Sequence, residues 1–61
     1  HAHRGMKMKA YSKSETVAAR NNGEIGVVID CESDVRFGWL YQVQFADNST
    51  KWFRSCEIRK A

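Results

Sequence analysis

Four short apolar segments alternate with polar turns along the chain. They cover residues 16–19, 25–31, 39–45 and 52–53, and Ile58 follows the last of them closely. In the third segment, three large apolar residues alternate with two glutamines. A period of two is typical of a strand with one buried and one wet face. The stretch 46–49 has the short polar side chains of a turn, so residues 50–53 can return as an antiparallel partner.

The first apolar segment is ambiguous between a helix and a strand. Ser14 could cap a helix and Gly23 could end it, but Val17 is the only large apolar residue between them. A helix with one apolar anchor buries too little to be stable. We therefore expect a strand over about residues 15–20, which pairs with the second strand across the turn 20–23. Residues 55–57 fit one turn of 3₁₀ helix.

These elements predict an all-β fold: five short strands that form a small SH3-like barrel, with a short 3₁₀ turn before the last strand. Gly26 inside the second strand is expected at a bend or bulge. Closing the sheet would also remove exposed edges. The expected core is Val17, Ile25, Val27, Ile29, Tyr41, Val43, Phe45, one of Trp52 and Phe53, and Ile58.

The 61 residues allow one domain. Residues 1–5, with two histidines, are interpreted as leftover tag sequence. We expect residues 6–13 to be a flexible N-terminal segment and residues 14–61 to be the barrel. A domain of this size buries about 60% of its unfolded surface, so its stability is modest and a homo-oligomer would help it.

With a net charge of +3 the chain is mildly basic, which is less positive charge than a strong nucleic-acid binder carries. Cys31 and Cys56 lack the close pairing that zinc sites need, so no metal or other cofactor is expected. No signal peptide and no membrane-spanning apolar run are visible. We expect a soluble cytoplasmic protein with reduced thiols and no membrane partner, although a disulfide stays open.

The order of residues resembles small SH3-like barrels of the Tudor and KOW type. The stretch "SETVAARNNGEIGVVID" is similar to their first two strands, and "YQVQFADNSTKWFRSCEI" to their later strands and 3₁₀ turn. The resemblance covers residues 14–59 and implies the fold. It implies little about function, because many functions occur on this barrel.

A weaker resemblance is to the plasmid-encoded type II dihydrofolate reductases. In that family the fourth strand lines the pore of a tetramer with a Val-Gln-Ile-Tyr stretch. Here residues 50–53 read Thr-Lys-Trp-Phe, so the ligand-binding glutamine and tyrosine are absent. No histidine lies beyond residue 3, so the usual general base is missing and the cysteines lack a partner that would activate them. We therefore predict a non-catalytic protein with no catalytic residues.

The remaining candidate chemistry lies in the aromatic residues. The chain has seven aromatic side chains, which is more than so small a core can hold. Three interpretations stay open: packing in the core or between copies, stacking on nucleic acid bases beside cationic groups, and a peptide groove or aromatic cage. We favour an interaction module for nucleic acid, with a peptide-binding or protein-binding module as the alternative. The candidate binding residues are Arg36, Phe37, Trp39, Lys51, Trp52 and Arg54.

Overall fold

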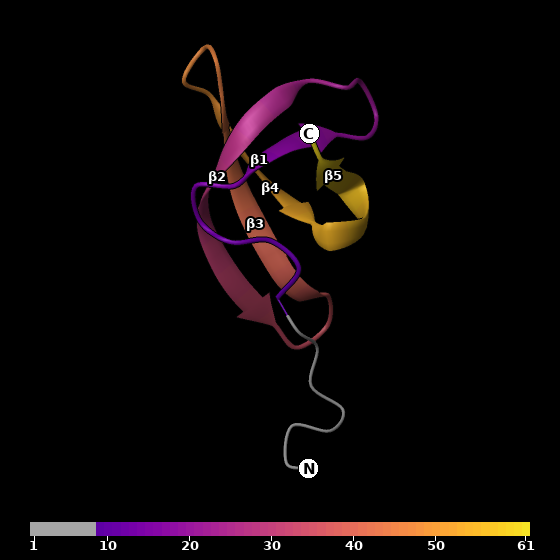
Figure 1. Cartoon of the computed structure of the whole chain (residues 1–61). Coiled ribbons are helices and arrows are strands. Elements are labelled where there is room, and N and C mark those ends of the chain that lie inside the picture. The colour runs from indigo at the N-terminus through magenta and orange to yellow at the C-terminus, as the bar shows by residue number, and fades with distance from the viewer. Residues whose placement is uncertain (1–8) are drawn as a thin grey trace.

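The computed structural model describes residues 9–61, which form one antiparallel sheet of five strands (Figure 1). The strands are β1 (Thr16–Ala19), β2 (Ile25–Asp34), β3 (Gly38–Phe45), β4 (Thr50–Arg54) and β5 (Ile58–Lys60). The 3₁₀ turn η1 (Ser55–Glu57) joins β4 to β5. The all-β prediction, the strand in place of a helix at residues 16–19, and the 3₁₀ turn before the last strand are all confirmed.

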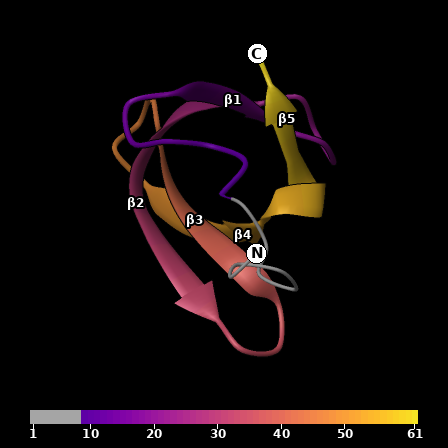
Figure 2. The ribbon, with the colours of Figure 1, turned by 60° about the horizontal axis from the view of Figure 1, so that its bottom comes forward.

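The strand order is β4-β3-β2-β1-β5, so β4 and β5 are the two edges of the sheet. Figure 2 shows how the sheet curls, which brings β1 and β5 across the interior from β3 and β4. In the described part of the chain, β4 and β5 are linked through η1 and not by a ladder. The sheet therefore keeps two edges that a fully closed barrel would not have.

All five strands contribute to the interior, with three residues from β3, two from β1 and one each from β2, β4 and β5. The buried cluster consists of Val17, Ala19, Val28, Tyr41, Val43, Phe45, Phe53 and Ile58. The rings of Phe45 and Phe53 meet edge to face with centroids 6.1 Å apart, a favourable arrangement for aromatic pairs. Between the two candidates in β4, Phe53 and not Trp52 enters the core.

The predicted orientation of β2 is wrong. Ile25, Val27 and Ile29 face outward with 38–51% of their surface exposed, whereas Val28 is fully buried. The reason is Gly26, whose position lies against the interior: a Cβ there would lie 2.5 Å from Cγ1 of Val43 and 3.0 Å from Cδ1 of Phe45. Side chains of β3 occupy the space, so the inward position of this strand has to be glycine.

A bulge in β2 then changes which residues face inward. The pairing with β3 shifts between Val28 and Asp30, which leaves one extra residue in β2, as a bulge requires. Beyond it, Cys31 pairs with Tyr41 and packs against the core. The strand is also longer than the apolar segment 25–31: it extends to Asp34, and residues 35–37 form the turn to β3.

Residues 9–13, which we expected to be flexible, make specific contacts with the sheet. The Ala10 N–H donates to the Tyr41 hydroxyl at 2.9 Å, and the Tyr11 hydroxyl donates to the Ile58 carbonyl at 3.2 Å. The two tyrosine rings meet edge to face at 5.2 Å. Only residues 6–8 of that predicted segment, and the predicted tag at 1–5, lie outside the described residues.

The turn between β3 and β4 is held by Asp47. Its carboxylate accepts hydrogen bonds from the Ser49 hydroxyl at 2.6 Å and from the Ser49 N–H at 3.0 Å. Asn48 has a positive φ of 70°, which asparagine tolerates better than most residues. These bonds, the hydroxyl one first, lower the pKa of Asp47 from its ordinary value near 3.8.

We expect Asp47→Asn to cause a small loss of stability at pH 7 that disappears at low pH. A lowered pKa means that the ionised carboxylate stabilises the fold above about pH 4, and that this contribution is lost as the pH falls through the folded-state pKa. Urea midpoints of the variant and the parent at pH 7 and at about pH 2 measure the difference. Equal differences at the two pH values would contradict this role of the charge.

Candidate binding face

Several large apolar side chains are exposed on the outer side of the sheet formed by β2, β3 and β4. Trp52 is 40% exposed, and Val27 and Ile29 are exposed to a similar degree. Trp52 pairs with Gln42 of β3, and Arg54 pairs with Leu40. Because side chains alternate across a strand, and Phe53 between them is buried, Trp52 and Arg54 share the outer side. We call this surface the outer face.

An arginine–phenylalanine cluster continues the outer face at the β2–β3 turn. The guanidinium carbons of Arg36 and Arg54 each lie 5.2 Å from the centroid of the Phe37 ring. Such contacts are favourable because the ring face is electronegative. Phe37 itself is 47% exposed. Trp52, Arg54, Phe37 and Arg36 therefore follow one another as alternating rings and cations.

The turn that presents Phe37 is fixed by one carboxylate. Asp34 accepts the Arg36 N–H at 2.7 Å and the Phe37 N–H at 3.2 Å through the same oxygen. Gly38 completes the turn with a positive φ of 79°, a conformation that glycine adopts without strain. The β2–β3 turn is therefore an ordered support for the ring.

Each guanidinium in the cluster also has a carboxylate neighbour. Arg36 lies 4.0 Å from Asp34, and Arg54 lies 3.8 Å from Glu57. Both pairs are largely solvated, and such surface ion pairs contribute at most about 1 kcal/mol each. A guanidinium group has five N–H donors, so both arginines keep donors for an anionic ligand.

Two of the six predicted binding residues, Trp39 and Lys51, do not lie on the outer face. Trp39 packs against the core from the inner side, with the Lys9 ammonium 5.4 Å from its ring. Lys51 pairs with the buried Val43, so it is on the inner side, where its ammonium lies 5.9 Å from the Phe53 ring. Because Trp39 and Trp52 point to opposite sides of the sheet, they cannot be two walls of one aromatic cage.

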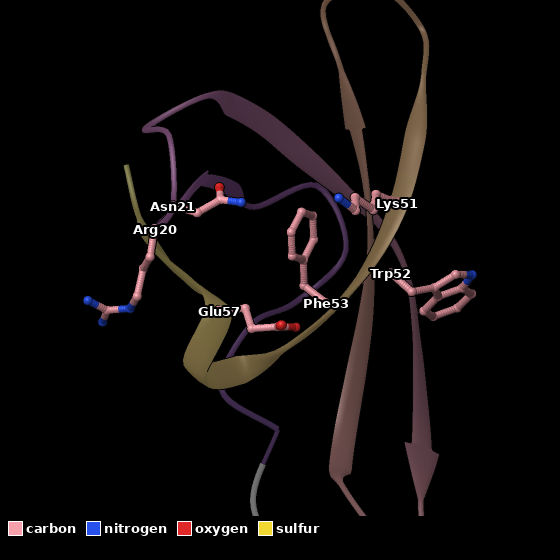
Figure 3. Close-up of a pocket in the computed structure, with 6 residues that line it drawn as sticks. All are labelled: Arg20, Asn21, Lys51, Trp52, Phe53 and Glu57. Atoms are coloured by element: carbon pink, nitrogen blue, oxygen red, sulfur yellow. The ribbon is translucent and has the colours of Figure 1, made fainter.

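A pocket at the free edge of β4 was missed by the sequence analysis. It has a volume of 330 Å³ and is lined by Arg20, Asn21, Lys51, Trp52, Phe53 and Glu57 (Figure 3). Its far wall is the β1–β2 turn, which the hydrogen bond from the Arg20 N–H to the Glu57 carbonyl holds at 3.0 Å. The sequence identified the turn itself, but its position beside β4 depends on how the sheet curls.

Within residues 9–61, no group of three or more His, Cys, Asp or Glu side chains could hold a metal ion. Cys31 and Cys56 are free thiols, half-buried and exposed respectively. No helix in this part of the chain is long and apolar enough to span a membrane.

Comparisons of the chain with protein-family models, with curated proteins and with solved structures gave no significant match. The resemblance to SH3-like barrels of the Tudor and KOW type therefore stays a prediction from sequence.

Proposed function

We propose that this protein is a non-catalytic SH3-like module of the cytoplasm, similar to Tudor and KOW domains, and that its outer face binds single-stranded nucleic acid. In this proposal Trp52 and Phe37 stack on bases, and Arg36 and Arg54 neutralise the adjacent phosphates. Proteins that bind single strands without sequence preference combine these two elements, aromatic platforms and a cationic track.

The observation that supports the proposal is the order of side chains on the outer face. Arg54 lies between two half-exposed rings, Trp52 on one side and Phe37 on the other. Arg36 also contacts the Phe37 ring. Stacking of one base on an aromatic ring contributes about 1–3 kcal/mol. Two rings and two cations therefore suit a short single strand that is held by few phosphate contacts. This agrees with the small net positive charge of the chain, +3.

A protein ligand is the second candidate, and one observation favours it. Val27 and Ile29 lie on the same outer face as Trp52 and are each nearly 40% exposed. Exposed apolar side chains grouped on one face are typical of protein interaction surfaces. The two candidates differ in their response to salt, because only phosphate binding releases a proportional number of condensed counterions.

We expect the affinity for an eight-nucleotide oligo(dT) to fall with salt at a log–log slope of about −1.4, because two arginines each contribute about −0.7 on a single strand. Quenching of tryptophan fluorescence measures the binding. Arg54→Ala should reduce the slope to about −0.7, and Arg54→Lys should leave it near −1.4 while weakening binding. Arg59→Ala on β5 is the matched control and should change neither. A slope near zero, or an equal effect of the two alanine variants, would contradict the proposal.

A further inference from the structure

The outer edge of β4 carries backbone groups that point away from the sheet. In an antiparallel ladder, successive residues direct their N–H and C=O groups alternately toward the partner strand and away from it. The Arg54 N–H donates to the Glu57 carboxylate at 2.8 Å, so Arg54 faces away from β3. Trp52 and Thr50, two and four residues earlier, therefore face away from β3 as well.

Glu57 blocks only the Arg54 end of this edge. Beside the remaining residues lies the 330 Å³ pocket. Figure 3 shows the Phe53 ring standing in the pocket, with the Asn21 amide and the Lys51 ammonium on either side of it and Trp52 on the opposite side of β4. An extended segment that paired with Thr50 and Trp52 would place the side chain opposite Lys51 directly into this pocket, because side chains alternate along a strand.

The charges around the pocket favour an anionic side chain. The Glu57 carboxylate is already held by the N–H and the guanidinium of Arg54. Arg20 and Lys51 form no ion pair with any carboxylate of residues 9–61. The pocket is therefore lined by the Lys51 ammonium, which has no carboxylate partner among residues 9–61, by an acid that is ion-paired with Arg54, and by an aromatic ring, whereas the Arg20 guanidinium points away from that ring (Figure 3).

A second copy of this chain is a poor occupant of the same edge. If two β4 strands paired around Trp52, each Thr50 would lie opposite an Arg54 whose N–H is already bound to Glu57. If they paired around Lys51, the two lysines would face each other, and like charges directly opposite are destabilising. Both registers conflict with the observed contacts, which favours a different partner.

We propose that the outer edge of β4 binds an extended acidic peptide as an additional strand. The backbone of the peptide pairs with Thr50 and Trp52, which is the recognition mode known as β-augmentation. Its acidic side chain enters the pocket beside Lys51, and the residues before and after that side chain lie on the outer face beside Trp52, where apolar side chains fit.

The probe is the peptide acetyl-Thr-Val-Glu-Val-Thr-amide, and its matched control has Lys in place of Glu. Titration of the ¹⁵N-labelled protein is followed by backbone amide shifts and by hydrogen exchange. At saturation, exchange of the Thr50 and Trp52 amides should slow at least tenfold, because the added strand protects them. A peptide with both valines N-methylated should fail to protect them, because it lacks the donors opposite these residues.

Two charge reversals test the pocket. Lys51→Glu should weaken binding of the Glu peptide at least tenfold and should strengthen binding of the Lys peptide, as expected for a close charge pair. Arg59→Glu makes the same change in net charge on β5 and should alter affinity less than twofold. Unchanged exchange at Trp52, equal binding of the two peptides, or equal effects of the two reversals would overturn the proposal.

The experiment also separates this site from the nucleic-acid face. Phe37→Ala should weaken oligo(dT) binding and leave peptide binding unchanged, whereas Lys51→Glu should act mainly on the peptide. Protection of the Trp52 amide by oligo(dT), lost in Lys51→Glu, would show that the pocket takes phosphate and would overturn the peptide proposal.

Discussion

Replacing Tyr41 with alanine is expected to unfold the domain. Tyr41 is fully buried at the centre of the inner side, its ring packs on Tyr11, and its hydroxyl accepts the Ala10 N–H. Truncation of a large buried aromatic side chain costs about 3–5 kcal/mol. A domain of this length has a total stability of roughly 3–9 kcal/mol, so most of it is lost. Circular dichroism with a urea titration measures the loss.

Tyr41→Phe is the matched control for this prediction. It keeps the ring and its packing and removes only the hydroxyl, so the cost should be about 1 kcal/mol. Ala10 is exposed, and its N–H can turn to water when the acceptor is absent. If the two variants lost the same stability, the hydrogen bond to the N-terminal segment and not the packing of the ring would be the main contribution of Tyr41.

Gly26→Ala is expected to be nearly as damaging, although it adds one methyl group. The new Cβ would lie 2.5 Å from Cγ1 of Val43 and 2.8 Å from the backbone oxygen of Gln44. The valine has few alternative rotamers in a filled core, and the backbone oxygen belongs to the central strand β3. Overpacking of this kind costs about 1–3 kcal/mol, and we expect the upper end. The free energy of unfolding from urea titration measures it.

Gly23→Ala makes the same chemical change in the β1–β2 turn. There the added Cβ meets nothing within 4 Å, but φ is +73°, so the cost is backbone strain of about 1 kcal/mol. Gly26→Ala should therefore be clearly the less stable of the two variants. The reverse order would mean that β2 does not present Gly26 to the interior, and the assignment of its outer residues would fail with it.

Most of the fold could be predicted from local patterns. The alternation of residues 41–45 and the turn after them predicted the β3–β4 hairpin, the single apolar anchor Val17 favoured a strand over a helix, and residues 55–57 predicted the 3₁₀ turn. The orientation of β2 could not be predicted in this way. Ile25, Val27, Val28 and Ile29 are all apolar, so either side of the strand could face inward. The contact between Gly26 and two side chains of β3 decides it, and a contact of this kind is not visible in the sequence.

The candidate site was predicted only in part, again because contacts between distant residues are not visible in the sequence. The rings and cations of residues 36, 37, 52 and 54 were chosen from composition, and the structure brings them to one outer face. Trp39 and Lys51 were chosen with them, but strand alternation from the buried Tyr41 and Phe53 places both on the inner side. The pocket beside β4 depends on the curl of the sheet, which brings Arg20 next to β4.

We expect nucleic acid to contact the outer face and to leave the inner face untouched. The two tryptophans report the two sides separately, because Trp52 is exposed on the outer face and Trp39 packs against the core. The most direct test is a titration with oligo(dT) followed by the two indole N–H signals in a ¹H–¹⁵N spectrum. The Trp52 signal should shift until it saturates, and the Trp39 signal should not move; a shift of Trp39 alone, or of neither signal, would rule out binding at the outer face.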